Sequence, residues 1–431
     1  MRGIAVLFLI VLFCQASYAD TVNNLSLKDY ISIALKNNPQ LKGSMAQYES
    51  SLADVSKSRS ALLPNISASA GSDLSYSKSA ENKIIRTGSS TSSNPSVGYN
   101  AGINARQTLF AFGKNSLQLK SSELIRDASK MDLASVRQNT IINAASAYYK
   151  YLLALELLNV NKELVSQATS HLEQAKVLVE IGKQAAYTVT KAKVDLANAN
   201  VEFVKAVNSV KLAKVQLETA AGISIDDSIR LTDSLSAAED QIELNYAMET
   251  AKKQNPGLLA SQIRLQAAEV TKKAVRSAYF PEIGLTGSVG YGNDLDNAWK
   301  TNWSAGVDVS VPIFSGGATS ASVSKAVSAE EKAQADLRSS ELDLQSQVQN
   351  CFLSKQEAQE RIKATEVLLE QAREGLTLTE ERYKTGSGTS LEITDAQASF
   401  ANAAKQHAQA LYDYHIAHLN LLKTIGLIDK Q

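Results

Sequence analysis

The sequence predicts an α+β membrane protein, built from a tandem duplication of a β-hairpin followed by a long helical hairpin. Three observations support this fold class. The chain begins with an export signal, and four short segments alternate between apolar and small polar residues. In addition, two long segments, 96–255 and 313–431, contain no proline, which is typical of helices far longer than the globular average.

The N-terminus has the three parts of a secretory signal peptide. Arg2 is the charged start, Ile4–Phe13 is the apolar core, and a small-x-small cleavage site ends at Ala19. We therefore expect residues 1–19 to be removed on export. Lipidation of Cys14 is not expected, because a lipoprotein signal has a small residue directly before its cysteine and this chain has a bulky one.

Composition excludes several classes of protein. Only Cys351 follows the signal, so no intramolecular disulfide can form. The 44 basic and 44 acidic residues balance, which argues against a nucleic-acid partner. No second apolar run approaches the roughly 18 to 20 residues of a membrane-spanning helix, so any membrane insertion must use β-strands. No catalytic or metal-binding motif is found, so we expect neither an enzyme nor a cofactor.

Two constant offsets reveal the duplication. Asn38-Pro39 recurs as Asn255-Pro256, an offset of 217 that also relates the segments around Pro64 and Pro281. Further on the offset is 204, and it relates five pairs: Ala101-Gly102 and Ala305-Gly306, Leu109-Phe110 and Ile313-Phe314, Gly113 and Gly317, Gly182 and Gly386, and Gly222 and Gly426. We therefore expect a first repeat over 20–222, a linker over 223–242 that contains a short strand, and a second repeat over 243–431.

Each repeat has two segments with a period of two residues, which predicts β-strands. They span 65–77 and 97–110 in the first repeat, and 282–292 and 302–314 in the second. One face is apolar and the other carries Gly, Ser, Asn and Asp, as in transmembrane strands between lipid and a wet lumen. A soluble sheet with one face on a core is the alternative. The residues expected to face the lumen include Asn100, Asn104, Arg106 and Asp308.

Long helices follow each strand pair. We expect them at 113–182 and 188–219, then at 317–385 and 390–424. Seventy residues span about 100 Å, which suits a tube across the periplasm. Four strands cannot close a barrel, and lipid does not tolerate open strand edges, so several chains must contribute: two would give eight strands, and three would give twelve and room for a passage.

The stretch 382–397 marks the turn between the last two helices. Gly386 and Gly388 provide backbone freedom, Thr389 or Ser390 can cap the returning helix, and Glu392 lies in its first turn. The two expected hairpin tips contain Gly182, Lys183, Gly386, Ser387 and Gly388.

At this point the layout resembles the TolC-like family of outer-membrane efflux proteins over nearly the whole mature chain. Two motifs carry the resemblance, Arg382-Tyr383 with Gly386, Leu391 and Asp395-Ala396-Gln397, and the junction Pro312–Gly317. The resemblance implies a homotrimer with a twelve-stranded barrel in the outer membrane of a Gram-negative bacterium and a twelve-helix coiled-coil tunnel in the periplasm. It also implies a periplasmic adaptor protein and an inner-membrane pump of RND, ABC or MFS type as partners. Efflux of small molecules and export of a polypeptide both remain open, because the pump selects the cargo.

Four residues are expected at the periplasmic gate. By resemblance, Tyr383 helps to close the entrance, while Glu392 and Asp395 occupy two inward acidic positions. Three chains would then place six carboxylates around the mouth, a ring that favours cations. Alternatively Glu392 only stabilises a helix start and Asp395 is solvated. The chain departs from the family at Gly388, where an arginine can stand, and Lys191 is expected to pair with Asp395 of a neighbouring chain.

Two rival interpretations remain. The chain could be a soluble periplasmic coiled-coil scaffold or adaptor without a pore. His415 and His418, three apart on a helix, have a spacing that could hold a metal ion, although packing is the preferred interpretation.

Overall fold

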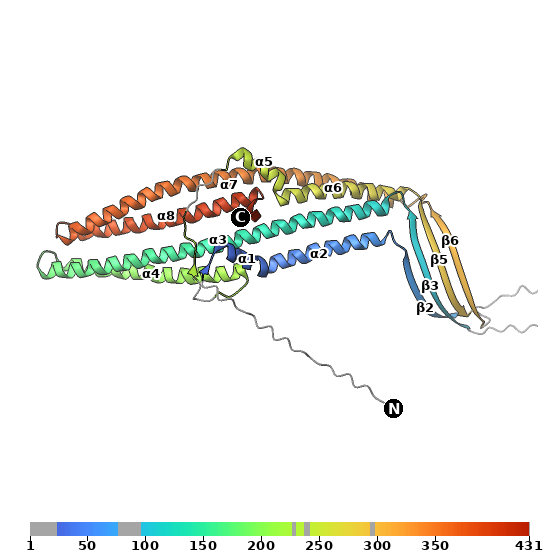
Figure 1. Cartoon of the computed structure of the whole chain (residues 1–431), viewed down its shortest axis with the longest axis horizontal. Helices are drawn as coiled ribbons and strands as arrows, with labels where there is room; N and C mark the ends of the chain where they lie inside the picture. Colours follow the sequence, from blue (N-terminus) through green and yellow to red (C-terminus); the bar gives the residue numbers. More distant parts are fainter. Residues whose placement is uncertain (1–23, 76–95, 226–229, 237–241, 294–297, 431) are drawn as a thin grey trace, which may run out of the picture.

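The structure is a computed structural model that describes residues 24–75, 96–225, 230–236, 242–293 and 298–430. The expected signal peptide and most of the polar loop after the first strand lie outside these ranges. The described residues form an elongated molecule, with a sheet at one end and the turns of two long helical hairpins at the other (Figure 1).

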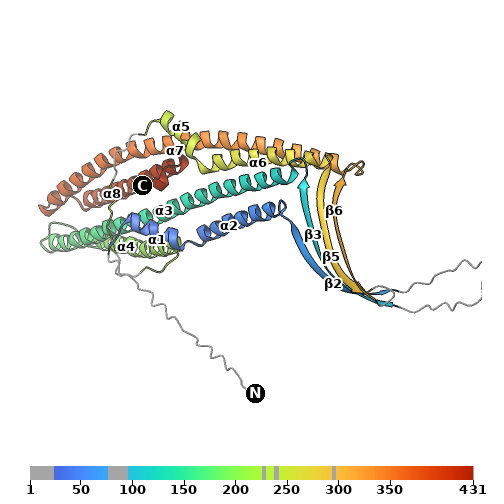
Figure 2. The same cartoon turned by 45° about the vertical axis from the view of Figure 1, so that its right-hand side comes forward.

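One antiparallel sheet contains four strands in the order β2 (Asn65–Ser75), β3 (Ser96–Phe110), β5 (Glu282–Asn293) and β6 (Trp299–Ser310). The register reproduces the duplication. Asn65 pairs with Arg106, and the residues 217 and 204 positions later, Glu282 and Ser310, also pair. The two hairpins therefore have the same register, and the sheet curves as a single layer in both views (Figure 2).

Four long helices form the two hairpins: α3 (Lys114–Glu180) with α4 (Ala186–Ala221), and α7 (Ala318–Lys384) with α8 (Ser390–Thr424). Helices α3 and α7 each have 67 residues and are about 100 Å long. Each begins after a glycine with positive φ, Gly113 at 82° and Gly317 at 86°, which turns the chain from strand to helix.

Shorter helices flank the halves of α3 and α7 nearest the sheet. They are α1 (Leu27–Asn37), α2 (Pro39–Ser60), α5 (Leu244–Gln254) and α6 (Pro256–Arg276), followed by the short η1 (Ser277–Tyr279). Asn38 and Asn255 break each pair in the same way, because each side chain accepts a backbone N–H of the next helix, which starts at a proline.

The hydrophobic core lies where these short helices meet the long hairpins. Gly222 and Gly426 end α4 and α8 with positive φ, and a β-carbon on Gly426 would lie 2.5 Å from the carbonyl oxygen of Gln254. The matching β-carbon on Gly222 would lie 3.4 Å from the carbonyl oxygen of Asn37. The repeats therefore use a glycine at the same place to bring a helix end against the start of the repeat. The chain ends in the short helix η2 (Ile428–Lys430).

The linker contains the expected short strand. β4 (Arg230–Leu231) pairs in parallel with β1 (Asn24–Leu25). A carboxylate oxygen of Asp233, just after β4, accepts the backbone N–H of Leu27 at 2.7 Å and the hydroxyl of Tyr148 at 2.7 Å. These bonds tie the linker to the start of α1 and to the middle of α3.

Strand β6 differs from its predicted bounds. It begins at Trp299, three residues early, and ends at Ser310, four residues early. Pro312 has no N–H to donate to a strand ladder, which explains the early end. Ile313 and Phe314 consequently lie outside the sheet, at 95% and 89% exposure.

Candidate functional site

The sheet has one polar face, set by its register. Asn104 pairs with Ser67 on one side and Ser288 on the other, and Ser288 pairs with Ser304. Because directly paired residues share a face, the expected lumen residues Asn100, Asn104 and Arg106 lie on this face with Asp308. Side chains bond across the strands, with Asn100 Nδ2 3.2 Å from Asp73 Oδ2 and the hydroxyls of Ser288 and Ser304 2.8 Å apart.

Lys300 joins this polar face, and the sequence prediction missed it. It pairs with Gly292, which in turn pairs with Asn100. The strand prediction started at 302, because Trp299 to Thr301 follow a polar loop with no alternation of their own. The lysine adds a positive charge to the polar face near the loop end of the sheet.

The opposite face is apolar, and none of the described residues covers it. Exposure is 69% at Ile66, 74% at Leu74, 77% at Trp303 and 64% at Val307. Burying a large apolar side chain is worth about 1.5–3 kcal/mol, so a sheet that leaves this many exposed is built to meet an apolar surface outside the chain.

Aromatic side chains gather at both ends of the apolar face. At the loop end Tyr291 stacks on Trp299, with ring centroids 5.0 Å apart. At the helix end Phe112 stacks on Phe280 at 5.0 Å and contacts Phe110 at 4.8 Å. Two aromatic belts that flank an apolar band are typical of strands that cross a membrane.

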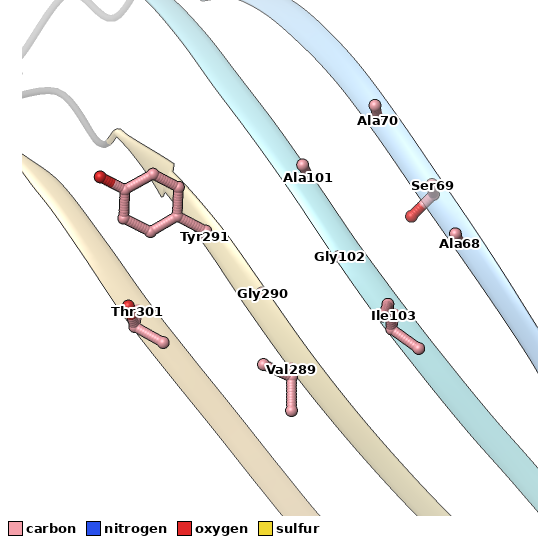
Figure 3. A pocket seen from close by; sticks show the side chains of 10 residues that line it. All are labelled: Ala68, Ser69, Ala70, Ala101, Gly102, Ile103, Val289, Gly290, Tyr291 and Thr301. Carbon is pink, nitrogen blue, oxygen red and sulfur yellow. The ribbon is translucent and has the colours of Figure 1, made fainter.

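Small residues on β2 and β3 hollow the apolar face (Figure 3). Ala70, Ala101, Tyr291 and Thr301 form one row across the four strands. The next row contains Ala68, Ile103 and Val289. The alanine methyl groups leave a shallow apolar depression that Ile103, Val289 and Tyr291 border.

Among the described residues, no helix is both long enough and apolar enough to cross a membrane.

Tyr383 is buried at the far end of the molecule, near the end of α7. Its hydroxyl donates a hydrogen bond to Gln184 Oε1 at 3.2 Å, and its ring packs 4.7 Å from the ring of His171 on α3. Leu178 and Ile393 complete the cluster. Burial raises the pKa of Tyr383, so the phenol stays neutral and acts as a donor. This residue therefore joins both hairpins at their tips.

The turn after Tyr383 depends on the two glycines that the sequence pattern predicted there, Gly386 and Gly388. Gly386 has a φ of +79°, and a β-carbon on Gly388 would lie 3.0 Å from the backbone nitrogen of Tyr383, so each position needs glycine for a different reason. The N–H groups of Ser387 and Gly388 both donate to the carbonyl of Arg382 at 3.0 Å. In the first hairpin Gly182 has a φ of +73° and is exposed.

The two turns lie side by side. A β-carbon on Gly386 would lie 3.6 Å from Cδ of Lys183, so the lysine side chain of the first tip lies along the second. Ser387 and Lys183 are exposed. Four of the predicted tip residues, Gly182, Lys183, Gly386 and Ser387, are therefore exposed at the end of the molecule, whereas Gly388 is buried.

Glu392 has partners within the chain. With Thr389 it forms a capping box, in which each side chain accepts the backbone N–H of the other residue at 3.2 Å. Its carboxylate also lies 3.6 Å from the guanidinium of Arg382. These contacts give direct support to the helix-start interpretation of Glu392, whereas Asp395 is exposed.

Lys191 has partners within its own chain, and its expected pairing with Asp395 of a neighbouring chain stays a prediction. Its ammonium lies 3.3 Å from Asp195 Oδ2, one turn later on α4, and 3.4 Å from Thr394 Oγ1 on α8. Thr394 in turn donates to Asp195 at 3.1 Å. Within the chain, Asp195 is a partner of Lys191 because it lies one helical turn away on the same face of α4 and is itself largely buried.

The histidines on α8 pack against aromatic rings. His415 stacks on Tyr149 with ring centroids 4.2 Å apart, and His418 stacks on Tyr414 at 6.2 Å. The described residues contain no group of three or more His, Cys, Asp or Glu side chains arranged to hold a metal ion. The observed contacts are those of the packing interpretation.

Comparison with known proteins now decides the family. The family model described as "Outer membrane efflux protein" matches residues 30–223 and 247–427, both repeats almost in full. The chain belongs to the outer membrane efflux protein family. This efflux protein therefore resides in the outer membrane of a Gram-negative bacterium, as a channel of the class that serves efflux and type I secretion.

Individual relatives agree. The outer membrane protein TolC of Vibrio cholerae is 28% identical over 423 residues, which cover 94% of this efflux protein and 92% of the relative. The alkaline protease secretion protein AprF of Pseudomonas aeruginosa is 24% identical, with 94% and 85% covered. The solved open state of the MtrE outer membrane channel of Neisseria gonorrhoeae has a TM-score of 0.79 at 23% identity, with 94% and 90% covered.

We predict that His415 makes this efflux protein acid-sensitive. Burial is the main reason that the pKa of His415 falls to about 4, while an unfolded histidine has a pKa of about 6.5. Above pH 6.5 both states are neutral; below it the unfolded state binds a proton that the folded state rejects, down to about pH 4. The free energy of unfolding should therefore fall by up to about 3 kcal/mol per chain across this window.

Thermal unfolding in detergent, followed by circular dichroism, measures this effect. A His415→Phe variant keeps a ring for Tyr149 to stack on and should lose part of the acid sensitivity. An equal fall in melting temperature for the variant and the original chain would contradict the prediction.

Proposed function

We propose that three copies of this chain form a passive exit channel through the outer membrane, which an adaptor protein and an inner-membrane pump open at its periplasmic tip. The observation that carries the proposal is a sheet with an exposed apolar face, a polar second face and two unpaired edges, joined to helices about 100 Å long.

The unpaired edges support association. Among the described residues β2 and β6 each have a strand partner on one side only. In hydrocarbon every backbone N–H and C=O needs a partner, so β6 of one copy must meet β2 of the next. Three copies give twelve strands, enough for a lumen lined by the polar face. Twelve residues at about 3.4 Å each, tilted by about 45°, cross about 29 Å, which matches the hydrocarbon thickness.

The duplication supplies a register for this contact between copies. Within the chain Ala105 of β3 pairs with Gly287 of β5. The equivalent of Ala105 is Val309 of β6, 204 positions later, and the equivalent of Gly287 is Ala70 of β2, 217 positions earlier. The ring closes with the same geometry at every step if Val309 of one copy pairs with Ala70 of the next.

Exposed apolar side chains on the long helices support a closed tunnel. In α4 they include Val194, Val201, Val204, Leu212 and Val215, and in α7 they include Leu342, Leu353, Val367, Leu368 and Leu378. Packing between copies would cover these positions and give a tube of twelve long helices, four from each chain. A soluble scaffold without a pore would leave the apolar face of the sheet in water, which disfavours that alternative.

The contacts of Tyr383 support a gate at the tips. In the described chain it connects the end of α7 to Gln184 in the turn between α3 and α4. We propose that this contact helps to hold the entrance closed, and that the two tips receive the adaptor through the exposed Gly182, Lys183, Gly386 and Ser387, with Gly388 shaping the turn beneath them. The names of the relatives include both an outer membrane efflux protein and a protease secretion protein, so we propose that the cargo follows from the pump that engages the channel.

Membrane fractionation tests the proposal as a whole. The chain should remain in the membrane after carbonate extraction and should migrate as a trimer on gels until it is heated. Extraction by carbonate, together with a monomer in unheated samples, would favour the soluble scaffold instead.

Replacement of Tyr383 by Phe should raise single-channel conductance in planar bilayers. The variant loses the 3.2 Å hydrogen bond to Gln184, worth about 1 kcal/mol per chain, and keeps the packed ring. Tyr187→Phe is the matched control, because Tyr187 lies near the same tip and is 74% exposed. Unchanged conductance in Tyr383→Phe would remove this residue from the gate.

If Glu392 and Asp395 form an acidic ring at the tunnel mouth, neutralising each of them should change ion selectivity by a different amount. Asp395→Asn should lower the cation-to-anion permeability ratio more than Glu392→Gln, because Arg382 already offsets part of the Glu392 charge. Glutamine can still accept the capping hydrogen bond, so neither variant should disturb the helix start. Reversal potentials in a salt gradient measure the ratio. If both variants keep the original ratio, the two carboxylates do not line the mouth.

A further inference from the structure

A polar seam joins the two hairpins just above their tips. On α3, Gln167, His171 and Gln174 recur at four and three residues and therefore share one face of the helix. On α8, Ser390 and Gln397 are seven residues apart, as Gln167 and Gln174 are on α3, and therefore also share one face of their helix. His171 Nε2 lies 3.2 Å from Ser390 Oγ, which places the two faces in contact. We call these five residues the α3–α8 seam.

Four polar atoms of the seam are buried without a hydrogen-bond partner among the described residues: Gln167 Oε1, His171 Nδ1, Gln174 Oε1 and Gln397 Nε2. His171 is 1% exposed and Gln397 is 9% exposed. These atoms are already covered within one chain, so a neighbouring copy cannot reach them. The closed seam is therefore less well satisfied than a seam of apolar residues would be.

His171 faces groups from three other elements. From α7 it meets the ring of Tyr383, and from α8 it meets Ser390. From α4 it experiences the charges of Asp195 and Lys191, which oppose each other. The other carboxylates near the start of α8 are turned elsewhere: Glu392 contacts Arg382, and Asp395 is exposed. On α3 itself, the nearby ionised groups Glu173 and Lys176 pair with each other.

We propose that His171 is a positioning residue of the tunnel entrance, which holds Tyr383 in the closed arrangement while neutral and releases it when protonated. The inference rests on the proposed channel and adds an acid response to its gate. A neutral imidazole meets Ser390 through Nε2 and leaves Nδ1 as an acceptor. A protonated imidazole has two N–H donors, and in the closed arrangement Nδ1 has no hydrogen-bond partner among the described residues.

The direction of the response follows from burial. Burial is the main cause that lowers the pKa of His171 in the closed arrangement. In an opened, hydrated seam the imidazole would regain its ordinary value of about 6.5. Protons therefore bind the open arrangement more tightly, and acid shifts the population towards it. From about pH 7.5 to about pH 5.5 the ratio of open to closed should rise by up to about tenfold per chain.

Single-channel recording of the full trimer in planar bilayers, in symmetric buffers at the two pH values, tests the proposal. Acid should increase conductance in the original channel, and His171→Gln should remove most of that increase, because glutamine keeps a polar contact for Ser390 but does not titrate. His407→Gln is the matched control, since His407 also lies against a hairpin partner, Thr365, but outside the seam. The control should retain the full acid response.

A distance measurement serves if His171→Gln gives no channel. Spin labels at Tyr187→Cys and Leu391→Cys, both exposed tip positions, should move apart on acidification in a Cys351→Ser background that retains His171. A response of His171→Gln equal to that of the original channel, or an unchanged label distance, would overturn the role of His171. Absence of any channel from the original chain would instead contradict the proposed function itself.

Discussion

The structure depends on one constraint, the need of the four-stranded sheet to satisfy both its apolar face and its two open edges. Trp303, Val307 and Leu74 are more than half exposed, and β2 and β6 each lack one neighbour among the described residues. A single chain can meet neither requirement. Lipid can cover the face, but lipid cannot bond to the edges, and this chemistry of the backbone is the reason that we propose closure against further copies.

The long helices transmit that arrangement to a distant site. Each hairpin begins at a glycine beside the sheet and turns about 100 Å away, so in the proposed trimer the packing of copies at the membrane also sets how the tips meet. The tips use a different chemistry from the sheet. There, one buried tyrosine, a half-buried lysine–aspartate–threonine contact and a polar seam hold the hairpins together. Such contacts can separate into water at small cost, as a gate requires.

Sequence patterns predicted the architecture well because it is repetitive. Two offsets located both hairpins, and the sheet register reproduces them residue by residue. Side-chain partners were harder to predict. The contact of Lys191 with Thr394, the hydrogen bond from Tyr383 to Gln184 and the place of His171 beside Tyr383 all depend on how separate helices rotate against each other. The early end of β6 was readable from Pro312, but the apolar alternation continued past it and concealed the boundary.

Cross-linking between β6 and β2 tests the central claim most directly. In a Cys351→Ser background, Val309→Cys and Ala70→Cys on the same chain lie on opposite edges of the sheet and cannot meet within one copy. The closed ring predicts that mild oxidation links them between copies and yields a covalent trimer that survives heating. Pairing Val309→Cys with Leu74→Cys, four residues away along β2, should give little product. A monomer after oxidation, or equal yields from both pairs, would contradict closure in this register.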